Sequence, residues 1–196
     1  MIVLALAGCS GLATDGSDCR PDGPLAGFGA TPDEWRTIDA SALGGVSVFW
    51  RGLDLSLASD LESASRGRCF SPVIGLDWSE STDRPWVPGE DSSAFLAALS
   101  TFVQTHRPPY LFVGFESDFL FETSPLEYPL WLSFYDALYD LVKSGSPETR
   151  VGPVFNFEHL SGAGTFAGWI TPRWEALSRY DPQRIDTVGL TLFPFF

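Results

Sequence analysis

Basic residues are scarce in this chain. Lys and Arg together number 12 among 196 residues, against 25 Asp and Glu, which gives a formal net charge of −13. Nucleic acid phosphates and anionic lipid headgroups both attract clustered Lys and Arg, so this charge balance disfavours partners that bind through either. We therefore expect no nucleic acid partner, whereas a neutral ligand such as a sugar is unaffected by the charge.

Histidine and cysteine are also few, with two and three residues. The sequence contains no HExxH and no CxxC, the spacings typical of zinc sites. It has no P-loop Gly-Lys-Ser/Thr, and "GFGATP" (27–32) lacks the third glycine of a dinucleotide-binding turn. No Gly-x-Ser-x-Gly elbow occurs either. These absences lead us to expect no cofactor and no metal.

Long apolar runs are missing except at the start, and "MIVLALAGCSG" is too short to span a bilayer. This stretch is similar to the end of a bacterial lipoprotein signal peptide, which implies a lipobox at Leu6-Ala7-Gly8-Cys9, cleavage before Cys9 and lipid on its thiol. Residues 1–9 would then be signal peptide and 10–24 a flexible tether, in a protein exported and lipid-anchored to the cell envelope. No Lys or Arg precedes the run, and the alternative is a buried N-terminal strand.

Two cysteines remain if Cys9 carries lipid. An exported protein tolerates a disulfide, and an even count permits one. Cys19 and Cys69 each precede a predicted strand and would lie at the same end of a parallel sheet. They can therefore either pair or stay as thiols.

Apolar, strand-like runs alternate with longer amphipathic runs along the rest of the chain. Thr31 is a suitable N-cap with Pro32 at the first helical position. Helical spacing predicts one core face made of Phe95, Leu96, Leu99, Phe102 and Val103, and another made of Leu130, Phe134, Leu138 and Leu141. The predicted strands are 25–30, 45–50, 71–78, 110–115, 151–157 and 186–193, and the predicted helices are 31–43, 56–67, 91–106, 129–145 and 172–181.

Near-continuous apolar strands that alternate with helices predict an α/β fold with a parallel sheet, either open and doubly wound or closed as a (β/α)₈ TIM barrel. In both, functional side chains gather at the carboxyl ends of the strands. Polar residues do cluster after the predicted strands, namely Arg51, Asp54, Asp77, Glu80, Glu116, Asp118, Asn156 and Glu158.

Three stretches carry a family resemblance: "PYLFVGFESDF", "FYDALYDLVKSGSPETRVGPVFNFEHLSG" and "DTVGLTLFPF". They resemble consecutive parts of a clan A glycoside hydrolase barrel, most closely endo-galactanase-like and cellulase-like enzymes. The resemblance implies that Glu116, at the end of the fourth strand, is the general acid/base. It also implies that residues 25–196 hold about six of eight βα units. We therefore expect an N-terminal fragment whose nucleophile, a Glu ending the seventh strand, is missing.

The acid role needs a carboxyl group that holds a proton near neutral pH, which apolar surroundings favour. Strand alternation predicts that Phe112, Gly114 and Glu116 point into the barrel, with Gly114 leaving room for a sugar. Asp118 is interpreted as a solvated loop residue or a helix cap.

The clan has an Asn before the acid, which helps to hold the sugar 2-hydroxyl, and Phe115 stands in its place. Aromatic rings at strand ends can stack on sugars, and polar side chains there can bind hydroxyls. The predicted substrate-binding residues are Trp50, Trp78, Glu80, Phe115, Asn156, Glu158 and Phe193.

Two functions follow from these residues. The first is a retaining glycoside hydrolase that acts on cell-surface or extracellular polysaccharide or oligosaccharide, inactive as this fragment alone. The alternative, which Phe115 favours, is a non-catalytic carbohydrate-binding surface lipoprotein on a degenerate barrel.

Overall fold

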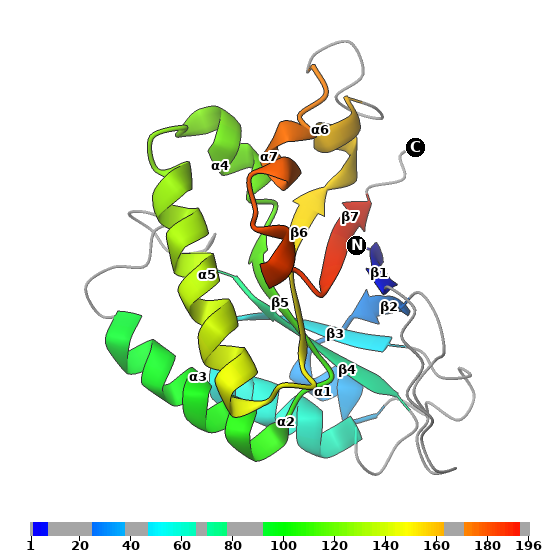
Figure 1. The fold of residues 1–196 in the computed structure, drawn as a ribbon. Coiled ribbons are helices and arrows are strands. Elements are labelled where there is room, and N and C mark those ends of the chain that lie inside the picture. The colour runs from blue at the N-terminus through cyan, green and yellow to red at the C-terminus, as the bar shows by residue number, and fades with distance from the viewer. Residues whose placement is uncertain are drawn as a thin grey trace.

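A curled β-sheet with helices against its outer side forms the centre of the molecule (Figure 1). The computed structural model describes residues 2–7, 25–37, 47–65, 70–77, 92–162 and 171–192. The strands are β1 (Ile2–Ala7), β2 (Leu25–Gly29), β3 (Ser47–Gly52), β4 (Ser71–Leu76), β5 (Tyr110–Phe115), β6 (Arg150–Asn156) and β7 (Thr187–Leu192). The helices are α1 (Pro32–Trp35), α2 (Leu55–Ser65), α3 (Ser92–His106), α4 (Asp118–Thr123), α5 (Tyr128–Gly145), α6 (Phe157–Ser161), α7 (Glu175–Ser178) and the 3-10 helix η3 (Pro182–Arg184).

The strands from β2 to β7 are ordered as in the sequence, and each is parallel to the next. Each apolar run predicted to be a strand matches one of them to within a few residues. Parallel strands need crossover connections, and from β3 to β6 these contain α2, α3 and α5 on the outer side of the sheet. The architecture is therefore an α/β parallel sheet with helices, consistent with an incomplete TIM barrel.

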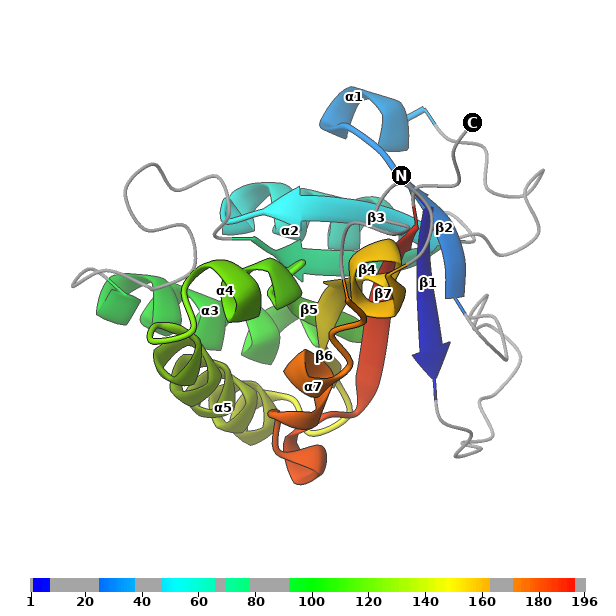
Figure 2. The same ribbon diagram turned by 90° about the horizontal axis from the view of Figure 1, so that it is seen from above.

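The remaining strand, β1, runs antiparallel to both of its neighbours. It pairs with β2 on one side and β7 on the other, so that the ring of strands closes (Figure 2). This strand is the apolar stretch for which the sequence suggests either a signal peptide or an N-terminal strand. Cys9 lies outside the described residues, and its lipidation stays a prediction.

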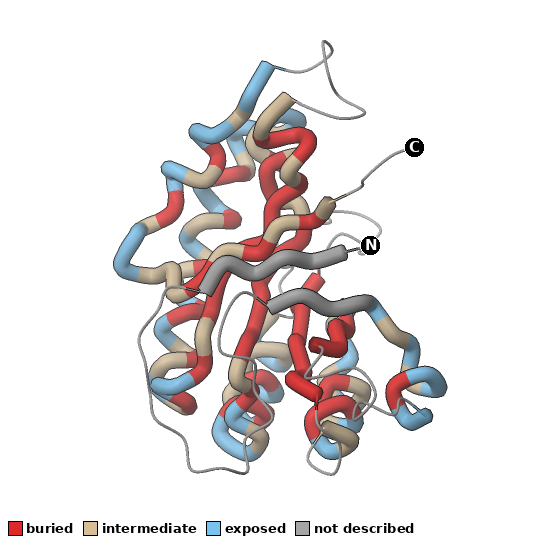
Figure 3. The backbone as a smooth tube through the Cα atoms, turned by 90° about the vertical axis from the view of Figure 1, so that its right-hand side faces the viewer, coloured by how far each residue is buried: buried red, intermediate tan, exposed pale blue. Residues whose placement is uncertain are grey.

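A large apolar cluster fills the space between the sheet and the helices. It joins outward strand residues such as Val113 and Phe155 to the buried faces of α2, α3 and α5. Figure 3 shows most of the described strand backbone as buried and the helices as a mixture of buried and exposed residues. The predicted core face of α3 is confirmed, with Leu99, Phe102 and Val103 buried and Phe95 and Leu96 packed beside them.

The predicted core face of α5 is wrong for Leu130, which is 58% exposed. The buried face carries Trp131, Tyr135, Tyr139 and Val142 together with the predicted Leu138. The predicted Phe134 and Leu141 are partly buried and pack against the same cluster. The polar tips of the aromatic residues find partners, which permits their burial. Tyr135 Oη, for example, donates to the backbone oxygen of Arg184 at 2.8 Å.

A second, smaller cluster fills the inside of the curled sheet. It consists of Phe49, Val73, Tyr110, Phe112, Phe115 and Val154. These side chains come from β3, β4, β5 and β6, so the interior is a packed core. Above it lie the carboxyl ends of the strands, where α4, α6 and α7 gather (Figure 1).

None of the helices in the described ranges combines the length and the apolar character needed to cross a membrane.

Candidate active site

The carboxyl end of β5 departs from regular strand geometry. Its pairing with β6 shifts between Phe112 and Phe115, so β5 holds one extra residue. Gly114 has φ +75° and Glu116 has φ +57°. A Cβ on Gly114 would lie 2.2 Å from Trp131 Cζ2, on the outer, helix-covered side of the sheet. The predicted alternation is therefore wrong at Gly114, which makes room for an indole ring and not for a sugar.

Glu116 nevertheless lies among inward-facing residues of the neighbouring strands. Thr191 of β7 donates through Oγ1 to Glu116 Oε1 at 2.7 Å, and Asn156 of β6 donates through Nδ2 to the same oxygen at 3.3 Å. The Glu116 backbone N–H donates to the oxygen of Val154 at 2.8 Å. The left-handed backbone at Glu116 turns the chain out of the strand directly after the inward-facing Phe115. A non-glycine residue in that conformation is strained, and such strain is concentrated at functional sites.

Phe115 points into the packed interior and is almost fully buried, at 1% exposure. Its ring meets the edge of Phe49 with centroids 5.3 Å apart, and the guanidinium of Arg51 lies 5.1 Å above it. Arg51 also pairs with the buried carboxylate of Asp77 after β4. Asp77 therefore forms an ion pair at the carboxyl end of the sheet, where Glu116 also lies.

Asp118 is fully buried, so its interpretation as a solvated loop residue is wrong. Its Oδ2 lies 2.5 Å from His159 Nδ1, and its Oδ1 accepts the backbone N–H of Asn156 at 3.1 Å. The other ring nitrogen of His159 lies 2.7 Å from Glu122 Oε2. Desolvation of a carboxylate is costly unless it is paired, and His159 provides that partner. We call Asp118, Glu122 and His159 the buried histidine cluster, in which Asp118 and His159 are buried and the Glu122 side chain is 37% exposed.

The pKa values in this cluster move in opposite directions. Burial lowers the pKa of His159, but hydrogen bonds with Asp118 and Glu122 outweigh this effect, so that the pKa lies above its ordinary value. The hydrogen bond with His159 is the main cause that lowers the pKa of Glu122. Both shifts favour a positively charged His159 imidazole beside a negatively charged Glu122.

Ser117, directly after Glu116, is held by an aromatic group that is separate from the buried histidine cluster. Its Oγ lies 2.8 Å from Tyr180 Oη, and Trp131 Nε1 donates to the same phenol oxygen at 2.8 Å. Ser117 and Trp131 are fully buried and Tyr180 nearly so. The strained turn is therefore fixed both by this aromatic group and by the buried histidine cluster.

The structure brings together some of the predicted substrate-binding residues and separates others. Asn156 contacts Glu116 directly, and Phe115 precedes it. Trp50 is 6% exposed and belongs to the cluster between sheet and helices, away from Glu116. Glu158 is buried on α6. Trp78, Glu80, Phe193, Cys9, Cys19 and Cys69 lie outside the described residues.

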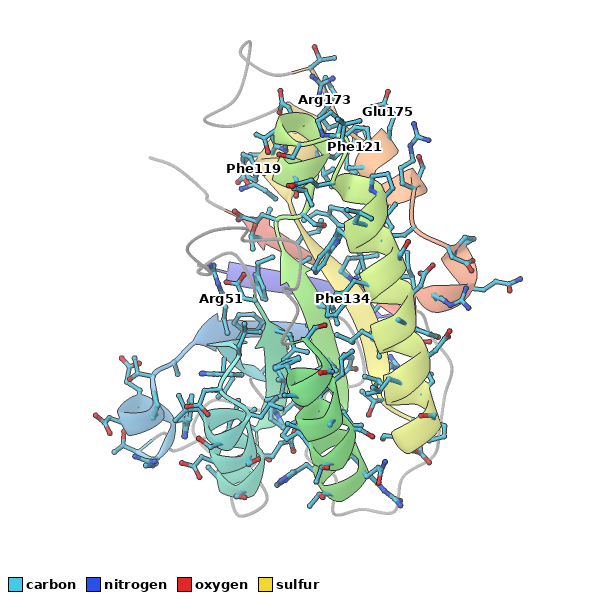
Figure 4. The ribbon with its side chains drawn as sticks, turned by 90° about the vertical axis from the view of Figure 1, so that its left-hand side faces the viewer. Arg51, Phe119, Phe121, Phe134, Arg173 and Glu175 are labelled. Atoms are coloured by element: carbon cyan, nitrogen blue, oxygen red, sulfur yellow. The ribbon has the colours of Figure 1, made fainter. Side chains whose placement is uncertain are left out.

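Sequence reasoning missed the buried histidine cluster and Thr191. The spacing of Asp118 and Glu122, four residues apart on a short helix, places both on one face and was the available signal. Figure 4 shows Phe119, Arg173 and Glu175 at the same end of the molecule, where α4, α6 and α7 meet. Within the described ranges, no group of three His, Cys, Asp or Glu residues is arranged to hold a metal ion.

We compared the sequence and the fold with known proteins. No family model matches the sequence, and no curated protein matches it. The structural neighbours are glycoside hydrolases with a curled parallel sheet. A GH18 chitinase from Pseudoalteromonas aurantia aligns with a TM-score of 0.56 and 14% identity, covering 86% of this chain and 66% of the chitinase. At that identity the likeness shows a shared fold.

Two further neighbours align over shorter stretches. An exo-beta-1,4-mannosidase from Opitutaceae bacterium strain TAV5 gives a TM-score of 0.48 at 18% identity, over 65% of this chain and 29% of the mannosidase. A GH5_18 protein from Streptomyces cattleya, in complex with Manb1-4GlcNAc, gives 0.47 at 16% identity, over 66% of this chain and 41% of that protein. The chain thus spans less than two thirds of the length of each neighbour.

Proposed function

We propose that this chain is part of a glycoside hydrolase that acts on polysaccharide or oligosaccharide, with Glu116 as the general acid/base. One observation carries the proposal. Glu116 lies in a strained turn at the carboxyl end of a parallel strand, and its carboxyl group is held by two neutral donors, the Thr191 hydroxyl and the Asn156 amide.

Neutral donors suit a residue that changes its charge during the reaction. A general acid/base alternates between the protonated and ionised forms, and neither Thr191 nor Asn156 carries a charge that would favour only one of them. Asp77 and Asp118 differ, because Arg51 and His159 lie against them. Of these three strand-end carboxyl groups, Glu116 is therefore the one suited to proton transfer.

The orientation of the carboxyl group agrees with this role. Thr191 and Asn156 both donate to Oε1, and neither of the two contacts Oε2. Oε2 can therefore carry the proton and direct it at a glycosidic oxygen while Oε1 remains anchored. A general acid must reach the leaving oxygen within hydrogen-bond distance, which such anchoring favours.

The finer parts of the proposal come from the sequence resemblance. They are a barrel with about six of its eight βα units in this sequence, and retention of configuration through a nucleophilic carboxylate about 5 Å from Glu116. We assign that nucleophile to none of the described residues. Asn156 supplies an amide beside Glu116 although Phe115 stands where the clan has its Asn. Trp78, Glu80, Glu158 and Phe193 remain proposed sugar contacts.

The test is hydrolysis of a panel of neutral glycans by the full-length protein. The panel contains β-1,4-galactan, cellulose, mannan and chitin oligosaccharides, and the release of reducing ends is followed over time. We expect release from at least one of them. Binding of a glycan in calorimetry without any release would instead favour the alternative, a carbohydrate-binding protein on a degenerate barrel.

The location is a separate part of the proposal. If the protein is exported and lipidated at Cys9, the cleavage removes Ile2–Ala7, and β1 is lost from its place between β2 and β7. We expect mass spectrometry of the mature protein to find an N-terminal, lipid-modified Cys9. An intact N-terminus would contradict lipidation and would leave β1 as part of the folded sheet.

A further inference from the structure

The imidazole of His159 has a carboxylate on each side. Its Nδ1 lies 2.5 Å from Asp118 Oδ2 and its Nε2 lies 2.7 Å from Glu122 Oε2, and His159 is fully buried. A neutral imidazole has only one N–H, whereas a carboxylate can only accept. Two such contacts are satisfied together when both nitrogens carry protons, which makes the ring an imidazolium.

The surroundings balance this charge. Arg173 Nη2 lies 3.6 Å from Glu122 Oε1, so two cations face the two carboxylates of the cluster. Glu158 precedes His159 on α6 and is also buried. The ring of Phe119 stacks on the imidazole with centroids 4.2 Å apart and planes at 14°, which favours a cation. A buried ion pair persists when hydrogen bonds satisfy its partners, and both oxygens of the buried Asp118 have one, from His159 and from the Asn156 backbone.

The cluster is connected to Glu116 through Asn156. The His159 backbone N–H donates to Asn156 Oδ1 at 2.8 Å, which fixes the orientation of the amide. The amide nitrogen of Asn156 is then directed at Glu116 Oε1. Asp118 accepts the backbone N–H of Asn156 and lies two residues after Glu116. The loops after β5 and β6 are therefore tied together next to the proposed acid/base.

We propose that His159 is a positioning residue for Glu116, which as an imidazolium holds α4 against α6 and thereby fixes Asn156 and the strained turn. This inference deepens the proposed function and rests on it. His159 is not itself a reacting group, because Asn156 and Asp118 lie between it and Glu116. Loss of one ring proton breaks one of the two contacts, because a nitrogen lone pair then faces the carboxylate of Asp118 or Glu122, which loosens the turn.

The protonation state can be measured without any assay of activity. In ¹⁵N-labelled full-length protein, long-range proton–nitrogen NMR spectra report both ring nitrogens of each histidine. At pH 7 we expect one histidine with both nitrogens protonated, and we expect its signals to vanish in His159→Gln. A neutral tautomer of His159 at pH 7 would overturn the proposal.

The positioning role is tested by the pH profile of Glu122→Gln. The glutamine oxygen still accepts from Nε2 but carries no charge, so the ring proton is held less tightly. We expect the alkaline limb of kcat to move to lower pH by about one unit or more, with little change in KM. The matched control is Glu175→Gln, since Glu175 is exposed on α7 and has no role in this cluster (Figure 4). Its profile should equal that of the wild type.

The outcomes separate the two proposals. An unshifted limb in Glu122→Gln, with hydrolysis intact, would show that His159 is merely structural and would overturn the inference alone. If the wild-type protein hydrolyses no glycan, the positioning role fails together with the proposed function. In that case the NMR spectra still test whether both ring nitrogens of His159 are protonated.

Discussion

Replacing Glu116 with Gln in the full-length protein is expected to lower kcat for glycoside hydrolysis by about 10²- to 10⁴-fold, the usual contribution of a general acid/base. The substitution preserves the size of the side chain, and an amide oxygen still accepts from Thr191 and Asn156. What it removes is the proton at the position of Oε2. KM should therefore change little, because the loss falls on the transition state and not on the binding of the substrate.

The dependence on the leaving group makes this prediction specific. A glycoside with a strongly acidic phenol as its leaving group needs little protonation of the departing oxygen. The rate of bond cleavage in Glu116→Gln should therefore fall much less for such a substrate than for an oligosaccharide. Single-turnover rates on both substrates measure the difference. Glu148→Gln, at an exposed turn before β6, is the control and should equal the wild type. Hydrolysis at the wild-type rate in Glu116→Gln would contradict the assignment.

Strands β2 to β7 could be predicted from the sequence because their signal is local. Each is a nearly continuous apolar run between turn residues, and this pattern does not depend on contacts elsewhere in the chain. The start of α1 could be predicted for a similar reason, because Thr31 precedes Pro32 and its backbone N–H donates to Glu34 Oε2 at 2.7 Å. The prediction of a helix over 172–181 is wrong, since α7 spans only Glu175–Ser178, and the short helices α4 and α6 were not predicted. What such signals leave open is which face of an element is buried when two faces are comparably apolar.

Helix α5 illustrates this limit. Spacing alone predicts a core face that includes Leu130, which is exposed, although Leu138 is buried and Phe134 and Leu141 pack against the core as predicted. It misses Trp131, Tyr135 and Tyr139, which are also buried. The choice depends on partners distant in the sequence. Tyr139 Oη donates to Asp186 Oδ1 at 3.0 Å, 47 residues further along the chain. No local pattern contains that information.

In the candidate site, too, local features could be predicted from the sequence, whereas contacts between distant residues could not. Glu116 could be selected from the sequence because it follows an apolar strand in a stretch that resembles a glycoside hydrolase barrel. Regular alternation of inward and outward side chains along β5 does not place Glu116, because a β-bulge between Phe112 and Phe115 interrupts that alternation. Gly114 inside the strand was the signal for that bulge. The burial of Asp118 could not be predicted, because His159 reaches it from α6, 41 residues further along the chain.

Gly114→Ala is the stability prediction with the largest expected effect. An L-residue in the left-handed conformation costs about 1–2 kcal/mol, and forcing extra volume into a packed core costs about 1–3 kcal/mol. Both apply at Gly114, where φ is +75° and the new Cβ would lie 2.2 Å from Trp131 Cζ2. We expect the free energy of unfolding to fall by roughly 2–5 kcal/mol, a large share of the 5–15 kcal/mol typical of a domain. Urea denaturation followed by circular dichroism measures it.

A matched control and a second variant separate the two causes. Gly29→Ala adds the same methyl group at the end of β2, where nothing lies within 4 Å of the new atom, and should change stability by at most about 0.5 kcal/mol. Trp131→Phe removes the ring atoms that a Cβ on Gly114 would meet. In the double variant Gly114→Ala/Trp131→Phe, the steric part of the cost should disappear while the conformational part remains, so the coupling energy is favourable. Strict additivity would mean that the indole does not occupy the space beside Gly114. The bulge that turns Glu116 towards Thr191 and Asn156 would then need another explanation.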